Sequence, residues 1–227
     1  LSLFFTIGAL SFTNLLAQTS NSNDIVVTVE GLGADSVFLA NYYGSRLFYS
    51  DTTVADVNGH FVFKGKPFDE CGKYAVVLPG PVFFDMMLVS EPMEFRTTMK
   101  NPQGDMQIIQ SEENKVFYDY LNFLNSKREE RTPHDAVLND STASSLQVEI
   151  ARNAMKVMNS EVLEYQDALI DEPRDYLFGK YLGMLREPQV PNAPSGIEDV
   201  RFWNYMWYRN HYWDRVDFAD SRLVRDG

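Results

Sequence analysis

The chain has 227 residues and a formal net charge of −12 at pH 7. Hydrophobic residues make up 44% and aromatic residues 14% of the sequence, which is enough for one or two ordinary cores and argues against a disordered chain. The acidic balance repels phosphate backbones and anionic lipid, and Lys and Arg form no stripe, so nucleic-acid binding is disfavoured. Cys71 is the single cysteine, which excludes an intramolecular disulfide and a CxxC motif within these residues.

The N-terminal residues are typical of a secretion signal. Residues 1–17 are uncharged and mostly apolar, and they end at Ala17, a small residue that a signal peptidase accepts. Thr13 and Asn14 interrupt the apolar run, so the run is short of the ~20 apolar residues that a membrane helix needs. The alternative, a buried N-terminal helix, fits the polar residues that follow less well.

We therefore predict a signal peptide over 1–17, a polar linker over 18–23, and a periplasmic or extracellular protein with no stable membrane anchor after cleavage. The chain opens with Leu1 and has no basic n-region, and it stops at Gly227 with no evident terminator. We expect both ends to be cut.

Residues 24–110 carry the pattern of short strands. Ile25, Val27 and Val29 alternate with more polar neighbours, as in a half-buried strand. Asn58-Gly59 between β-prone runs predicts a β-hairpin, because both residues tolerate a positive φ. Further strands are expected over 35–43, 47–54, 60–64, 73–78, 82–89, 93–99 and 106–110. Many short strands with Gly, Pro and Asn between them predict an antiparallel β-sandwich or small barrel.

After Ser111 the hydrophobic period changes to that of helices, so the fold class is predicted to be α+β, with a helical domain over 111–227. Ser111 suits the N-cap of a first helix, and a polar stretch over 127–140 connects it to a helix over about 143–170. Pro173 suits the first turn of a helix that runs to about 186. Ser195 and Glu198 form a capping-box pattern that opens a last helix.

No group of residues points to catalysis. Cys71 has no base that the sequence places beside it and is interpreted as inert. His211, Asp214 and Asp217 have a spacing that could hold a metal on a helix, but the interleaved aromatic residues favour a packing role. Asp85, inside an apolar strand, is interpreted as a charge that blocks edge-to-edge strand pairing. We assign no catalytic, cofactor-binding or metal-binding residue and expect no cofactor.

The C-terminal part is unusually rich in aromatic residues, too rich for one buried helix face. We predict that some of them meet another domain or chain, and a platform that stacks on sugars or peptides is the alternative. The candidate interaction surface consists of Trp203, Trp207, Tyr208, Tyr212 and Trp213.

Three segments resemble a known arrangement. These are Asp56-x-Asn58-Gly59-x-Phe61-x-Phe63-x-Gly65, the later Gly72-x-Tyr74, and Ser111-Glu112-x-Asn114-x-x-Phe117-x-x-Tyr120. They are similar to the N-terminal region of cell-envelope thioredoxin-like proteins of Bacteroidota, in which a small β-domain precedes a helical one, both of unassigned function. The segment 208–223 is similar to the end of that helical domain, and the signal end at residues 15–18 also suits the group.

The resemblance implies that a thioredoxin-like domain with a CxxC motif follows this region in the intact protein. Its matching residues are turns, caps and aromatic anchors, so it carries over no catalytic residue. The expected function is that of a non-catalytic accessory region of an exported thiol–disulfide oxidoreductase, which positions partners or dimerises. Expected partners are the downstream domain, a second copy or another envelope protein. The alternative is a stand-alone exported module that binds a peptide or a glycan.

Overall fold

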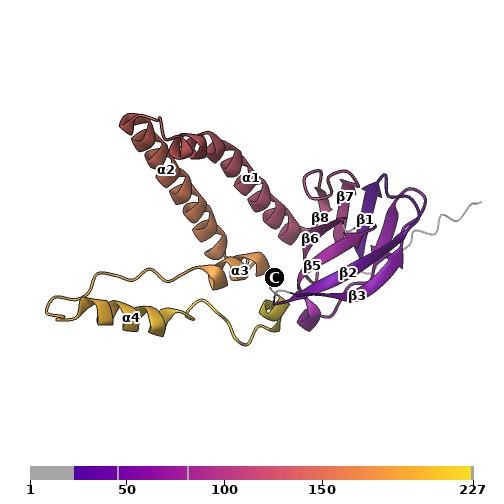
Figure 1. The fold of residues 1–227 in the computed structure, drawn as a ribbon. Helices are drawn as coiled ribbons and strands as arrows, with labels where there is room; N and C mark the ends of the chain where they lie inside the picture. The colour runs from indigo at the N-terminus through magenta and orange to yellow at the C-terminus, as the bar shows by residue number, and fades with distance from the viewer. Residues whose placement is uncertain (1–22, 45, 81, 226–227) are drawn as a thin grey trace, which may run out of the picture.

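The computed structural model describes residues 23–44, 46–80 and 82–225, which form a β-sandwich followed by a helical part (Figure 1). The presence of both sheets and helices confirms the α+β prediction. The two sheets are open and do not close into a barrel, so the sandwich is the correct one of the two predicted architectures. The predicted signal peptide lies outside the described residues, and none of the described helices is long and apolar enough to cross a bilayer. The strands are β1 (Ile25–Glu30), β2 (Ser36–Tyr43), β3 (Arg46–Val54), β4 (His60–Phe63), β5 (Gly72–Leu78), β6 (Val82–Leu88), β7 (Met93–Thr98) and β8 (Gln107–Gln110).

The sheets have the strand orders β4-β1-β7-β8 and β3-β2-β5-β6. Neighbouring strands are antiparallel except β1 and β7, which run parallel with Ile25 opposite Met93. This pair departs from the predicted antiparallel arrangement, because the chain passes through the opposite sheet before it returns beside β1. Inward-facing side chains of both sheets share one core, including Val27, Phe63 and Phe95 from the first sheet and Leu39, Tyr74, Val76, Phe84 and Met86 from the second.

The turn at residues 56–59 forms, but it joins strands of different sheets. The Asp56 N–H donates to the His60 carbonyl at 2.9 Å, and the Gly59 N–H donates to the Asp56 carbonyl at 3.0 Å. Because β3 pairs with β2 and β4 pairs with β1, the predicted hairpin is wrong as a strand pairing. Gly59 has a φ of 75°, and a Cβ there would lie 2.1 Å from the Val29 carbonyl oxygen. A glycine is therefore needed here for two reasons, the positive φ of the turn and the close packing of this backbone against β1.

The helices are α1 (Glu112–Asn139), α2 (Ser145–Ile170), α3 (Leu177–Leu185), α4 (Val200–His211) and the short 3₁₀ helix η2 (Ser221–Arg225). As predicted, the Ser111 hydroxyl caps α1 by accepting the Asn114 N–H at 3.0 Å. The helix then continues through the polar stretch that was predicted to be a connection.

Ion pairs explain this continuation of α1. Lys127 pairs with Glu130 at 2.9 Å and Arg131 pairs with Asp135 at 3.0 Å, at the i,i+3 and i,i+4 spacings that stabilise a polar helix. The helix even accommodates Pro133, which removes the hydrogen bond to the carbonyl four residues earlier.

The starts of α3 and α4 lie later than predicted. Asp175 has a φ of 55°, a left-handed conformation that ends any helix begun at Pro173, so α3 starts at Leu177. Gly196, with a φ of 94°, similarly breaks the predicted start at Ser195. The cap of α4 is instead Asp199, whose carboxylate accepts the Phe202 N–H at 2.9 Å.

Asn114 joins the first turn of α1 to β6, the edge strand of the second sheet. Its side chain donates to the Met87 carbonyl at 2.7 Å and accepts the Met87 N–H at 2.8 Å, as a neighbouring strand would. Glu113, beside it, accepts the backbone N–H groups of Leu177 and Phe178 at 3.1 and 2.7 Å. Two buried side chains thus join the sandwich, α1 and α3 into one body.

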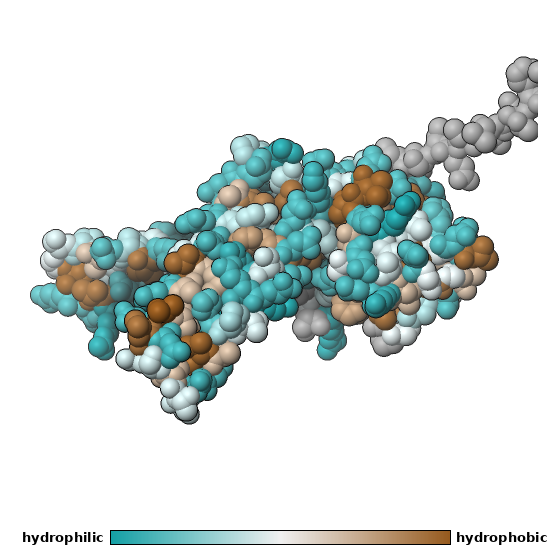
Figure 2. All heavy atoms as spheres, turned by 90° about the horizontal axis from the view of Figure 1, so that it is seen from above, coloured by the Kyte–Doolittle hydropathy of each residue, from teal (hydrophilic) through white to brown (hydrophobic). Residues whose placement is uncertain are grey.

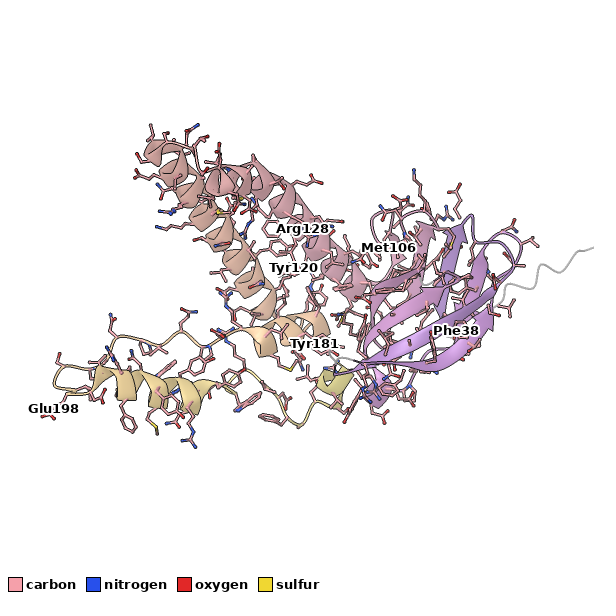
Figure 3. All side chains as sticks on the ribbon, viewed as in Figure 1. Phe38, Met106, Tyr120, Arg128, Tyr181 and Glu198 are labelled. Atoms are coloured by element: carbon pink, nitrogen blue, oxygen red, sulfur yellow. The ribbon has the colours of Figure 1, made fainter. Side chains whose placement is uncertain are left out.

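A second core lies at this junction and is formed by β6, α1, α3 and η2. It contains Met87 of β6, Phe117, Tyr118 and Tyr120 of α1, Leu177, Phe178, Tyr181 and Leu182 of α3, and Leu223 of η2. Figure 3 shows Tyr181 beside η2, where its hydroxyl donates to the carbonyls of Arg222 and Arg225. The end of the described chain is therefore fixed against α3.

Candidate functional site

Between α3 and η2 the chain makes a long excursion, residues 186–220, which we call the arm. Figure 1 shows it leaving α3 as an extended segment, turning at its tip and returning through α4. Glu198 marks the tip in Figure 3, far from the sandwich. No residue from 184 to 222 is buried, although the segment contains all three tryptophans of the chain. The arm thus lacks a core of its own.

Both ends of the arm are nevertheless anchored. At its start, the Arg186 guanidinium donates to Gln166 at 2.9 Å and to Asp167 at 3.0 Å on α2. At its end, Asp220 pairs with Lys180 at 3.0 Å and with Arg222. The hydrogen bonds from Arg222, more than any other contact, hold the pKa of Asp220 well below its usual range. These fixed ends give the arm a defined place on the molecule.

The aromatic residues predicted to form an interaction surface lie together on the arm. Rings are in contact from Tyr208 to Tyr212, from Tyr212 to Trp213 and from Trp213 to Phe218, with centroids 5.5, 4.7 and 5.7 Å apart. Trp213 is 55% exposed, whereas Trp203, Trp207 and Tyr208 are half-buried. Three of the predicted five, Tyr208, Tyr212 and Trp213, are thus in ring contact, and the five differ in exposure.

The prediction left out further exposed aromatic residues of the arm. Phe202 is 62% exposed, and Phe218, whose ring contacts Trp213, is 76% exposed, more than any of the predicted five. Their signal was present in the aromatic density that continues on both sides of residues 203–213. The Asn204 side-chain oxygen is buried on α4 and has no hydrogen-bond partner within the described residues.

Most buried polar atoms in folded proteins have a hydrogen-bond partner, so the Asn204 oxygen is an exception.

His211 has a packing role in the arm. Its ring stacks on Trp207 with centroids 4.1 Å apart, and its Nδ1 lies 2.7 Å from the Trp207 carbonyl. The described part of the chain contains no group of three or more His, Cys, Asp or Glu residues able to hold a metal. The spacing of His211, Asp214 and Asp217 is therefore not the geometry of a metal site.

A cavity of about 340 Å³ lies where the arm returns toward α2 and α3. Trp207, His211 and Tyr212 supply its aromatic wall, and charged groups from the other side complete it. Those groups include Asp167 and Arg186 on the anchor side and Asp214 and Arg215 after α4. Of these, only Asp214 was considered from the sequence, as a possible metal ligand, because the group comes together only through the fold.

Cys71 and Asp85 lie away from the arm. Cys71 is 1% exposed, and burial raises the pKa of its thiol, which disfavours the reactive thiolate. Asp85 accepts a hydrogen bond from the Tyr42 hydroxyl at 2.8 Å and faces Lys73 at 3.7 Å. Tyr118 and Asn114 of α1 bond to the backbone of β6, the edge strand that contains Asp85. This edge is therefore covered, and Asp85 serves as a partner of Tyr42 and Lys73 rather than as a charge that protects a free edge.

Comparison with known proteins finds no matching family model and no matching curated protein.

Proposed function

We propose that this chain is the non-catalytic accessory region of an exported thioredoxin-like thiol–disulfide oxidoreductase, and that its arm docks a protein partner. The downstream thioredoxin-like domain is the partner that the proposal puts first. The observation that carries it is the arm itself, an anchored excursion that displays aromatic side chains and buries none of its residues.

The energetics favour a protein partner for this surface. Burial of one large apolar side chain contributes roughly 1.5–3 kcal/mol, and Phe202, Trp213 and Phe218 are each more than half exposed. Trp, Tyr, Phe and Arg are the residues enriched at the centres of protein interfaces. Arg201 and Arg209 are exposed on α4, although the arm as a whole carries more Asp and Glu than Lys and Arg. The exposed rings of the arm therefore suit a partner surface that is apolar.

The thiol chemistry of the proposed enzyme must come from outside this chain. Disulfide exchange needs an accessible thiolate, and usually a second cysteine to resolve the mixed disulfide. Cys71 is the single cysteine of the sequence, and it is buried with a raised pKa. An accessory role, rather than a catalytic one, is what these residues support.

The coding sequence after Gly227 tests the proposed family context. A domain of about 150 residues with a Trp-Cys-x-x-Cys motif is expected, and a stop codon at that place would contradict the proposal. If the domain is present, it can be produced separately and titrated into this chain while tryptophan fluorescence is recorded. The tryptophan fluorescence of the arm should change as the domain is added. The variants F202A and W213A should weaken this change, whereas L146A, at an exposed position of α2, should not.

The cavity beside Trp207 favours a second candidate, a site for a glycan or a peptide. An aromatic wall facing carboxylate and guanidinium groups is an arrangement that can stack on a sugar ring and bind its hydroxyls. A panel of glycans and peptides should then quench tryptophan emission in the native chain and fail to do so in W207A. Absence of any response in the native chain would reject this candidate.

A further inference from the structure

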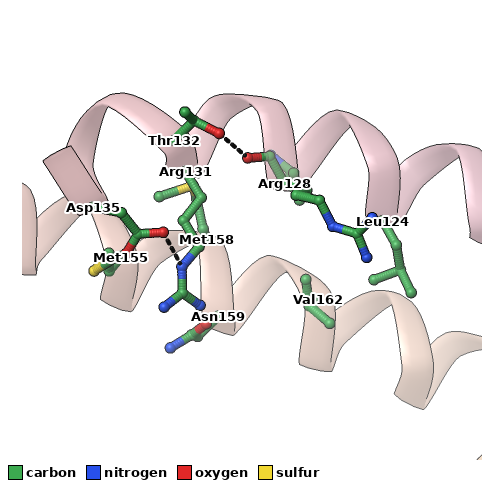
Figure 4. Close-up of a pocket in the computed structure, with 10 residues that line it drawn as sticks. Leu124, Arg128, Arg131, Thr132, Asp135, Met155, Met158, Asn159 and Val162 are labelled. Carbon is green, nitrogen blue, oxygen red and sulfur yellow. Dashed lines mark hydrogen bonds and ion pairs between the residues drawn. The ribbon is translucent and has the colours of Figure 1, made fainter.

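A separate cavity of about 430 Å³ lies between α1 and α2 (Figure 4). Figure 1 shows that these two helices form a hairpin that points away from the sandwich. Its size is within the usual range for small-molecule sites. Neither the arm nor the sandwich contributes a lining residue. The cavity therefore has no part in the proposed docking of a protein by the arm.

The floor of the cavity is apolar. Met158 is 6% exposed, and Leu124, Met155 and Val162 beside it are half-buried. Unbranched, polarizable methionine side chains adapt to apolar ligands of irregular shape. A flexible hydrocarbon chain can lie on this floor.

The rim of the cavity is basic in a chain whose net charge is −12. Lys127, Arg128 and Arg131 line it, with Asp135 as the single lining carboxylate. Figure 4 shows the Arg128 guanidinium reaching into the space between the two helices.

These three cations differ in what they already bind. Lys127 forms ion pairs with Glu130 and Glu161, and the Nε of Arg131 forms an ion pair with Asp135. Among the described residues, no carboxylate lies within ion-pair distance of the Arg128 guanidinium. Arg128 is therefore the group available to bind an anion, and its planar fork matches a carboxylate.

The hydrogen-bond ladder of α1 is interrupted beside the cavity, at Pro133. The proline cannot donate to the helix ladder, and the neighbouring Thr132 hydroxyl donates to the Arg128 carbonyl at 3.0 Å (Figure 4). The interruption lies between lining residues Thr132 and Asp135.

We propose that this cavity binds the carboxylate of a medium-chain fatty acid, with the carboxylate on Arg128 and the hydrocarbon chain on Met155, Met158 and Val162. The Arg128 guanidinium selects a negatively charged head group, and the apolar floor favours a hydrocarbon chain over a small anion.

Calorimetric titration of the purified chain with decanoate tests this proposal. Decanoate should bind, and decyltrimethylammonium, which has the same chain and the opposite charge, should not. R128Q should weaken decanoate binding about tenfold or more, because it removes a charge-assisted bidentate contact. R152Q is the matched control, since Arg152 is exposed on α2 and does not line the cavity, and it should leave the affinity unchanged.

M155E gives a second, independent variant at a half-buried lining position. The added carboxylate should abolish decanoate binding, and circular dichroism of the variant verifies that the helices are retained. The proposal is overturned if decanoate produces no binding heat, if the cationic ligand binds equally well, or if R128Q binds decanoate like the native chain.

Discussion

At the scale of single residues, the buried polar side chains at the junction determine how the two parts of the molecule meet. Asn114 is 0% exposed and occupies both backbone groups of Met87, while Glu113 is 6% exposed and receives two N–H groups from the start of α3. Ser111 was recognised as a cap from its sequence pattern, but the roles of Asn114 and Glu113 depend on residues far away in the chain. Local pattern cannot reveal such contacts.

The Asn114 contact should be essential to stability. N114A leaves the N–H and C=O groups of Met87 buried without partners, and we expect it to lower the free energy of unfolding by about 2–4 kcal/mol. Urea denaturation measures the loss. N122A, at an exposed position of the same helix, is the control and should change stability little. Equal stability of N114A and N122A would show that the junction does not depend on this amide.

Glu113 should give the junction a pH dependence. Burial raises the pKa of its carboxyl, although the two N–H groups from α3 oppose this. The folded state then holds a proton at pH values at which the unfolded state has released it. Its contribution to stability therefore grows as the pH falls from the raised pKa toward the ordinary value of about 4.3.

The variant E113Q isolates this effect because the amide does not titrate. The difference in unfolding free energy between the native chain and E113Q should shift in favour of the native chain as the pH is lowered from 8 toward about 5. Denaturation at a series of pH values measures it. A difference that stays constant, or shifts the other way, would mean that the pKa of Glu113 is not raised.

At the scale of elements, the sequence predicted where strands lie far better than how they pair. Alternation and turn residues are local, and all eight predicted strands are found. The partner of each strand is set by long-range packing, so the turn at residues 56–59 was interpreted as a hairpin although it crosses between sheets. Likewise, ion pairs extend α1 through a stretch whose polarity indicated a connection.

The crossing turn should depend on Gly59 for two reasons. Its φ is positive, and a Cβ would collide with the Val29 carbonyl of β1. G59A should therefore cost at least about 3 kcal/mol of stability. Gly33 also has a positive φ but has open space around it, so G33A should cost only about 1–2 kcal/mol. Thermal or urea unfolding compares the two, and equal losses would rule out the close approach to β1.

At the scale of the whole molecule, the described chain consists of two packed cores and one arm that no other part covers. The sandwich core and the junction core contain the buried apolar residues of the two packed parts, while the arm adds aromatic surface and no buried residue. Aromatic density predicted a surface of this kind from the sequence. Its anchors at Arg186 and Asp220, and the cavity beside Trp207, arise from α2 and α3 and could not be predicted without the fold.

Amide hydrogen exchange of the arm tests the central claim most directly, by comparing this chain with the proposed longer protein in which a thioredoxin-like domain follows Gly227. The isolated chain should exchange the amides of α4 rapidly, since the helix has no buried residue to protect it. In that longer protein the same amides should exchange at least about tenfold more slowly, because the proposed partner domain would cover them. Equal exchange of residues 200–211 in the two proteins, with the thioredoxin-like domain present, would contradict docking by the arm.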